Sequence, residues 1–143
     1  MYMTHGKERV VVLTDATDYA ENATMRAIEL AGQQNWILHF LCIKEELPEP
    51  FFSAVEPFRQ EAIEAQQQKI LSALEGSDIE HHWVTLDGVP HSETLAYAKD
   101  IDASRIIVPP LVYKNFRGEQ PAFRSTSHKL ARACDRPLLF TQG

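Results

Sequence analysis

The stretch Arg105-Ile106-Ile107-Val108-Pro109-Pro110 decides the fold class of this chain. Its β-branched, apolar residues are typical of a strand that is buried on both faces, and the prolines end the strand. A loop continues through residues 111–118, and a helix begins at residues 123–127. A strand, a long loop and a helix N-terminus in this order favour anion binding, because free N–H groups and the helix dipole attract negative charge.

Strand and helix patterns alternate outward from this stretch. The expected strands are residues 10–13, 36–43, 80–86, 105–108 and 137–141. The expected helices are residues 18–31, 57–75 and 92–101, and a last one marked by Ser127, Leu130, Ala131 and Cys134. Residues 44–57 carry three prolines and several acids, so we expect a loop there, with Pro57 in the first turn of the helix that follows.

This alternation predicts an α/β fold with one doubly wound parallel sheet and helices on both faces. We expect five strands in the order 3-2-1-4-5, within a single domain spanning residues 1–143. Ligands of such sheets bind at the carboxyl ends of the strands, where the strand order reverses. That point lies between the first and fourth strands, so the loop after Pro109 falls on the predicted crevice.

Composition restricts the function. The formal charge is −6, which disfavours nucleic acid and anionic membrane surfaces as partners. No apolar run approaches a transmembrane span, and no signal peptide is visible at the N-terminus. The two cysteines, Cys42 and Cys134, lie in apolar patterns, which favours buried thiols in a reducing compartment. We therefore expect a cytoplasmic protein.

The histidines do not predict a metal site. His81 and His82 are neighbours on a strand, so their side chains point to opposite faces. His39 lies in an apolar strand, where a buried, hydrogen-bonded histidine is expected. The sequence has no Cys-x-x-Cys or His-x-x-x-His spacing and no nucleophile motif, so we expect neither a metal nor a catalytic residue.

Three segments of the chain form a recognisable set of motifs. They are residues 10–17 with the alanine-rich stretch 23–31, then Asp87-Gly88-Val89-Pro90, and then residues 125–140. In this order they resemble the first strand and helix, the Gly-x-Pro segment, and the closing helix and Pro-Val-Leu strand of the universal stress protein family. The resemblance spans nearly the whole chain. It implies an adenine nucleotide alpha hydrolase-like fold and a homodimer.

The phosphate-binding glycines of that family are missing here. ATP-binding members carry Gly-x-x-Gly, nine further residues, and then Gly before Ser or Thr. The matching positions are Pro110, Tyr113 and, with one extra loop residue, Arg124 before Ser125. Ala16 stands where the family has a glycine after the first-strand Asp. The resemblance therefore implies the branch of the family that does not bind ATP.

Seven residues form the predicted crevice: Asp15, Ala16, Ile43, Pro110, Arg124, Ser125 and Ser127. In family members the residue matching Asp15 lies beside the nucleoside, but a carboxylate at a strand end can equally bond nearby turn N–H groups. Ser125 and Ser127 suit phosphate contact, and they also suit a helix N-cap and its neighbour.

The loop side chains also have two interpretations. Lys114, Arg117 and Arg124 can hold an anion in place of backbone N–H groups, or they can belong to a solvated loop. Tyr113 and Phe116 can fill the crevice and exclude a nucleotide.

Three functional hypotheses follow. The first is a non-catalytic regulatory protein without a cofactor, acting on an unidentified protein and pairing as a homodimer through the edge strand 137–141. The second is a sensor that binds ATP or AMP with Mg in a modified crevice. The third is a slow nucleotide hydrolase, for which the sequence offers no general base or metal set beyond Asp15.

Overall fold

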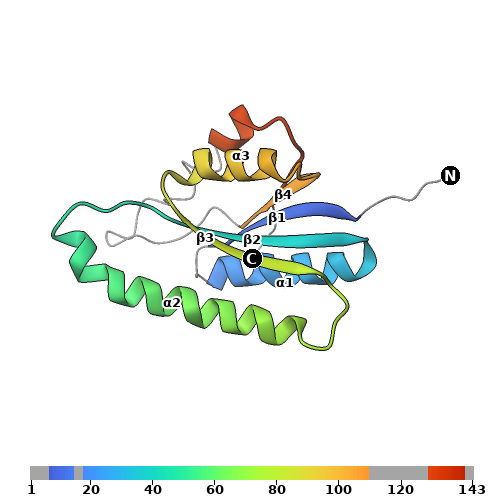
Figure 1. Cartoon of the computed structure of the whole chain (residues 1–143), viewed down its shortest axis with the longest axis horizontal. Coiled ribbons are helices and arrows are strands. Elements are labelled where there is room, and N and C mark those ends of the chain that lie inside the picture. The colour runs from blue at the N-terminus through green and yellow to red at the C-terminus, as the bar shows by residue number, and fades with distance from the viewer. Residues whose placement is uncertain (1–6, 15–17, 110–128, 141–143) are drawn as a thin grey trace.

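A single five-stranded sheet organises the chain in the computed structural model (Figure 1), which describes residues 7–14, 18–109 and 129–140. The elements in chain order are β1 (Glu8–Thr14), α1 (Asp18–Gln33), β2 (Trp36–Lys44), α2 (Phe51–Leu74), β3 (His81–Asp87), α3 (Pro90–Asp100), β4 (Arg105–Val108) and β5 (Leu138–Phe140). Residues 129–133 form a further helical stretch. Among the described residues, no helix is long and apolar enough to cross a membrane.

The predicted topology is confirmed. The strand order is β3-β2-β1-β4-β5, and every neighbouring pair is parallel. In the register, Val12 lies between Phe40 on β2 and Ile107 on β4. This places β1 beside β4, so the strand order reverses where the sequence predicts, and the carboxyl ends of the strands share one edge of the sheet.

Helices cover both faces of the sheet. In Figure 1, α1 and α2 lie on one side and α3 on the other. The layer under α1 and α2 is centred on Phe40, Leu38 and Ile70, and the layer under α3 is centred on Leu41, Ile106 and Ala98. Consecutive strand residues alternate between the two layers, as the two-residue period of a strand requires.

Small residues bring α1 close to the sheet. Ala23, Ala27 and Ala31 are buried, as their helical spacing predicts. Alanine has no side-chain atoms beyond Cβ, so the helix axis can approach strands whose own side chains are large.

Helix α2 begins six residues before the predicted position. Residues 51–56 are helical, and Pro57 lies inside the helix and not in its first turn. The expected loop at 44–57 is therefore wrong in its second half. Glu49 accepts hydrogen bonds from the Ser53 backbone N–H at 3.0 Å and from its hydroxyl at 2.7 Å, which stabilises the first turn ahead of the proline.

Three burial predictions for helices are wrong. The sequence predicts Leu71 on one apolar face of α2 together with Ile63, Ile70 and Leu74. Leu71 is instead 37% exposed, because it lies about 100° around the helix from buried Ile70. The sequence also predicts Gln66 among polar positions with Gln67 and Gln68, but Gln66 is buried. Ala131, expected on the inner face of the last helix, is exposed one residue after buried Leu130.

Candidate functional site

The predicted crevice lies at the carboxyl edge of the sheet. Thr14 ends β1 and Val108 ends β4, and these strands are hydrogen-bonded neighbours. Ile43 is half-buried one residue before the end of β2. The other six predicted site residues lie outside the described residues: Asp15, Ala16, Pro110, Arg124, Ser125 and Ser127. The same holds for the loop side chains Tyr113, Lys114, Phe116 and Arg117.

Thr14 brings a buried polar group to this edge. The residue is 2% exposed, and its hydroxyl has no hydrogen-bond partner within the part of the chain that the structure describes. Buried hydroxyls are normally paired, so an unpaired one at a strand end is a candidate ligand contact. The sequence analysis did not select Thr14, although its place directly before Asp15 was a usable signal.

A cavity of about 300 Å³ opens just past the ends of β2 and β3. It is lined by Glu45, Glu46, Gly88, Val89 and Pro90. This volume is at the lower limit of small-molecule sites. The start of α3 and the loop after β2 therefore line the same cavity.

Gly88 shapes the turn on the β3 side of this cavity. Its φ is +147°, and a Cβ atom there would lie 2.8 Å from Glu93 Cγ. Only glycine meets both conditions without strain. The Gly-x-Pro segment therefore serves a tight strand-to-helix turn next to the cavity.

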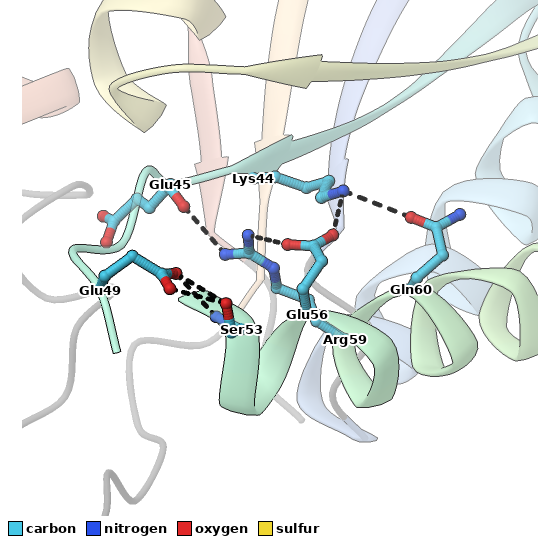
Figure 2. Close-up of polar contacts among 7 residues, drawn as sticks. All are labelled: Lys44, Glu45, Glu49, Ser53, Glu56, Arg59 and Gln60. Atoms are coloured by element: carbon cyan, nitrogen blue, oxygen red, sulfur yellow. Dashed lines mark hydrogen bonds and ion pairs between the residues drawn. The ribbon is translucent and has the colours of Figure 1, made fainter. Parts of the chain in front are cut away.

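An ion-pair network, drawn in Figure 2, stabilises the side of the cavity that is formed by the residues after β2. Arg59 on α2 donates to the Glu45 carbonyl oxygen at 2.9 Å and to the Glu56 carboxylate at 2.6 Å. Lys44 pairs with the same carboxylate and donates to Gln60 at 3.3 Å. These two cations hold the pKa of the Glu56 carboxyl below its ordinary value. The network ties the end of β2 to the first turns of α2.

The cavity has an acidic character. Glu45 and Glu46 both line it, whereas the nearby Lys44 and Arg59 are paired with Glu56. Two carboxylates at the rim repel phosphate groups and favour neutral or hydrogen-bond-donating groups. The described part of the edge therefore suits a base or sugar better than a polyphosphate.

Three histidines lie in the first halves of β2 and β3, away from the carboxyl ends of these strands. His39 is 7% exposed and contacts the Tyr97 hydroxyl through Nδ1 at 2.8 Å, so the predicted buried, hydrogen-bonded histidine is confirmed. His82 stacks on His39 with ring centroids 4.8 Å apart, while His81 Nδ1 contacts the Ile79 carbonyl oxygen at 2.9 Å. Within residues 7–14, 18–109 and 129–140, no group of three metal-ligating side chains occurs.

Comparison with known proteins identifies what the chain is similar to. The sequence profile described as the universal stress protein family matches residues 7–142. Curated protein sequences give no significant match.

Solved structures share the fold. A universal stress family protein from Burkholderia pseudomallei has 18% identity and a TM-score of 0.71, covering 95% of this chain and 96% of its own. A universal stress protein in complex with cAMP has 18% identity and a TM-score of 0.65, with coverages of 96% and 98%. One from Archaeoglobus fulgidus in complex with dAMP has 16% identity and a TM-score of 0.63, with coverages of 94% and 97%.

Proposed function

Because the chain belongs to the universal stress protein family, we propose that it is a non-catalytic regulatory protein that does not bind ATP and acts through protein contacts. The observation that carries this proposal is the sequence of the phosphate loop. Pro110, Tyr113 and Arg124 occupy the three positions where ATP-binding members have glycine.

The physical argument concerns backbone approach to phosphate. Glycine lets the chain come within hydrogen-bond distance of phosphate oxygens, and proline removes the N–H that would donate. Glu45 and Glu46 add negative charge at the neighbouring cavity. Both effects weaken the binding of a tetra-anionic ligand more than the binding of a nucleoside or a monophosphate.

Restoring the three glycines tests this proposal. The variant Pro110→Gly/Tyr113→Gly/Arg124→Gly should gain Mg-ATP affinity of roughly tenfold or more over the wild type, because backbone donors become available. Isothermal titration of both proteins measures it. The control Lys7→Gly, at an exposed position before β1, should leave affinity unchanged. A wild type that already binds Mg-ATP, and loses affinity in the triple variant, contradicts the proposal.

A specific observation favours a second candidate, an adenine-nucleotide sensor. The cavity of about 300 Å³ lies past the ends of β2 and β3, and two structural neighbours are described in complex with cAMP and dAMP. In this candidate, Arg124 or Lys114 replaces the missing backbone donors and Mg accompanies ATP. Micromolar binding of AMP or of Mg-ATP by the wild type supports it.

The regulatory protein is proposed to be a homodimer paired through β5. This strand lies at the edge of the sheet, and Leu139 on it is 37% exposed. An unpaired edge is a template for a second strand, and a two-fold axis pairs both edges at once. We propose the cytoplasm as its place of action, in keeping with two cysteines that form no disulfide.

The variant Leu139→Lys tests this dimer. A buried charge at the strand pair should shift the protein to monomers in sedimentation velocity experiments at micromolar concentration. Lys129→Leu, an exposed change outside β5, should not alter the mass. A variant with the wild-type dimer mass argues against pairing through β5.

A further inference from the structure

The cavity past the ends of β2 and β3 has two different walls. Val89 and Pro90 form an apolar wall, and Val89 is 54% exposed. Glu45 and Glu46, which follow β2, bring carboxylates to the other side. Ligand sites combine apolar area with a few polar groups that orient the ligand. This lining therefore matches a small molecule with an apolar body and one polar end.

Both carboxylates are without an ion-pair partner among the residues that the structure describes. Arg59 donates to the backbone carbonyl oxygen of Glu45 and not to its carboxylate, which points away from the guanidinium in Figure 2. Lys44, the other nearby cation, pairs with Glu56, and Arg59 pairs with the same group. The two cavity carboxylates are therefore left for a positive charge on a ligand.

The backbone on the α3 side of the cavity offers few donors to an anion. The Gly88 N–H already donates to the Lys44 carbonyl oxygen at 3.0 Å, and Pro90 has no N–H. Glu93 lies in the first turn of α3, and its Oε1 would be 3.3 Å from a Cβ atom at Gly88. This carboxylate offsets the positive end of the helix dipole. The cavity therefore disfavours negative charge from both sides.

A divalent metal ion suits the cavity less than an organic cation does. Ca²⁺ takes roughly six to eight oxygen ligands, and Mg²⁺ demands a near-ideal octahedron. No group of three metal-ligating side chains occurs in the part of the chain that the structure describes. An ammonium group is satisfied by a few acceptors, which two carboxylates and solvent can supply. The apolar wall then covers the organic part of the ligand.

We propose that this cavity binds a small primary amine in its protonated form. The ammonium group lies between Glu45 and Glu46, and the alkyl or aryl body packs on Val89 and Pro90. The cavity volume of about 300 Å³ limits this body to about the size of one ring. The inference goes beyond the proposed function, because it gives the regulator a small-molecule signal that carries no phosphate group.

Amide chemical shifts of the isotope-labelled full chain, followed during titration near neutral pH, test this site. The Gly88 and Val89 amides report binding at the cavity. Three probes separate charge from apolar contact: phenethylamine, the neutral phenethyl alcohol, and ethylamine, which lacks the ring. Glu45→Gln/Glu46→Gln removes the two charges with little change of shape. Its matched control, Glu61→Gln/Glu64→Gln, removes two charges at exposed positions of α2 that do not line the cavity.

The wild type should bind phenethylamine roughly tenfold or more tightly than either of the other two probes. Glu45→Gln/Glu46→Gln should lose roughly tenfold or more in affinity for phenethylamine, and the control variant less than about twofold. Unchanged Gly88 and Val89 shifts on addition of phenethylamine to the wild type overturn the proposal. Equal affinity of the wild type and Glu45→Gln/Glu46→Gln also overturns it.

AMP, added to the complex with phenethylamine, distinguishes an amine site from a nucleotide site. AMP should not displace the amine from the Gly88 and Val89 amides, because its phosphate would meet two carboxylates. Displacement by AMP would assign the cavity to nucleotides and overturn the amine proposal. The Mg-ATP titration of the three-glycine variant is a separate measurement, so this proposal and the proposed function can fail independently.

Discussion

Replacing Phe40 with alanine is expected to lower the free energy of unfolding by about 4 kcal/mol. Phe40 is fully buried at the centre of β2, and its ring centroid lies 6.3 Å from that of Trp83. It packs in the layer that joins the sheet to α1 and α2. Truncation removes the apolar contacts and leaves a cavity that the surrounding strands cannot close. A domain of this size is stable by only about 5–15 kcal/mol, so the loss is a large share.

Urea unfolding followed by circular dichroism measures this effect, and the chain supplies a matched control. Phe58→Ala makes the same chemical change on a side chain that is 73% exposed, and its expected cost is within about 0.5 kcal/mol. Equal losses for the two variants contradict the described packing of β2 under α2.

Acid is expected to destabilise the folded chain through His39. Burial of the ring against α3, with smaller contributions from His82 and Arg9, lowers the pKa of His39 from 6.5 to about 4, and Glu80 opposes this weakly. The Tyr97 hydroxyl contacts Nδ1, and the buried Nε2 has no partner within the described residues. The folded chain therefore keeps the His39 imidazole neutral between pH 6.5 and about pH 4.

Proton linkage gives the direction in which folding stability changes with pH. Well above pH 6.5 the ring is neutral in both states, and stability does not depend on it. As the pH falls from 6.5 to about 4, the unfolded chain binds a proton that the folded chain does not, so stability declines. The shift corresponds to at most about 3 kcal/mol, and we expect about 2 kcal/mol because the adjoining His82 is half-exposed to solvent.

Urea midpoints between pH 7 and pH 4 measure this decline. His39→Asn keeps a polar atom near the position of Nδ1 but cannot bind the proton, so the decline should shrink by about 2 kcal/mol. His91→Asn, in the first turn of α3, serves as the control and should retain it. A decline of the same size in His39→Asn and the wild type would show that other groups cause the acid sensitivity.

Hydrophobic pattern explains why the sheet could be predicted. The runs in β1, β2 and β4 are nearly continuous because those strands are buried on both faces, and Arg105–Val108 has the predicted bounds. The more polar β3 was expected at an edge, and it lies there. Strand order then followed from short right-handed crossovers.

Long-range contacts explain what could not be predicted. The first turns of α2 follow a segment with two prolines and contain Pro57, and they are stabilised by the pairing of Glu56 with Lys44 at the end of β2. The cavity depends on register, which sets Lys44 beside Asp87 and so brings Glu45 close to Gly88. Neither arrangement has a local sequence signal. The Gly-x-Pro turn does, and it was recognised only through the family resemblance.

Calorimetric titration of the purified, nucleotide-free wild-type protein with Mg-ATP, and then with AMP, tests the central claim most directly. A regulator without the phosphate-binding glycines should release no heat with either ligand at millimolar concentration. Micromolar binding of Mg-ATP would contradict this account and make the protein a nucleotide sensor.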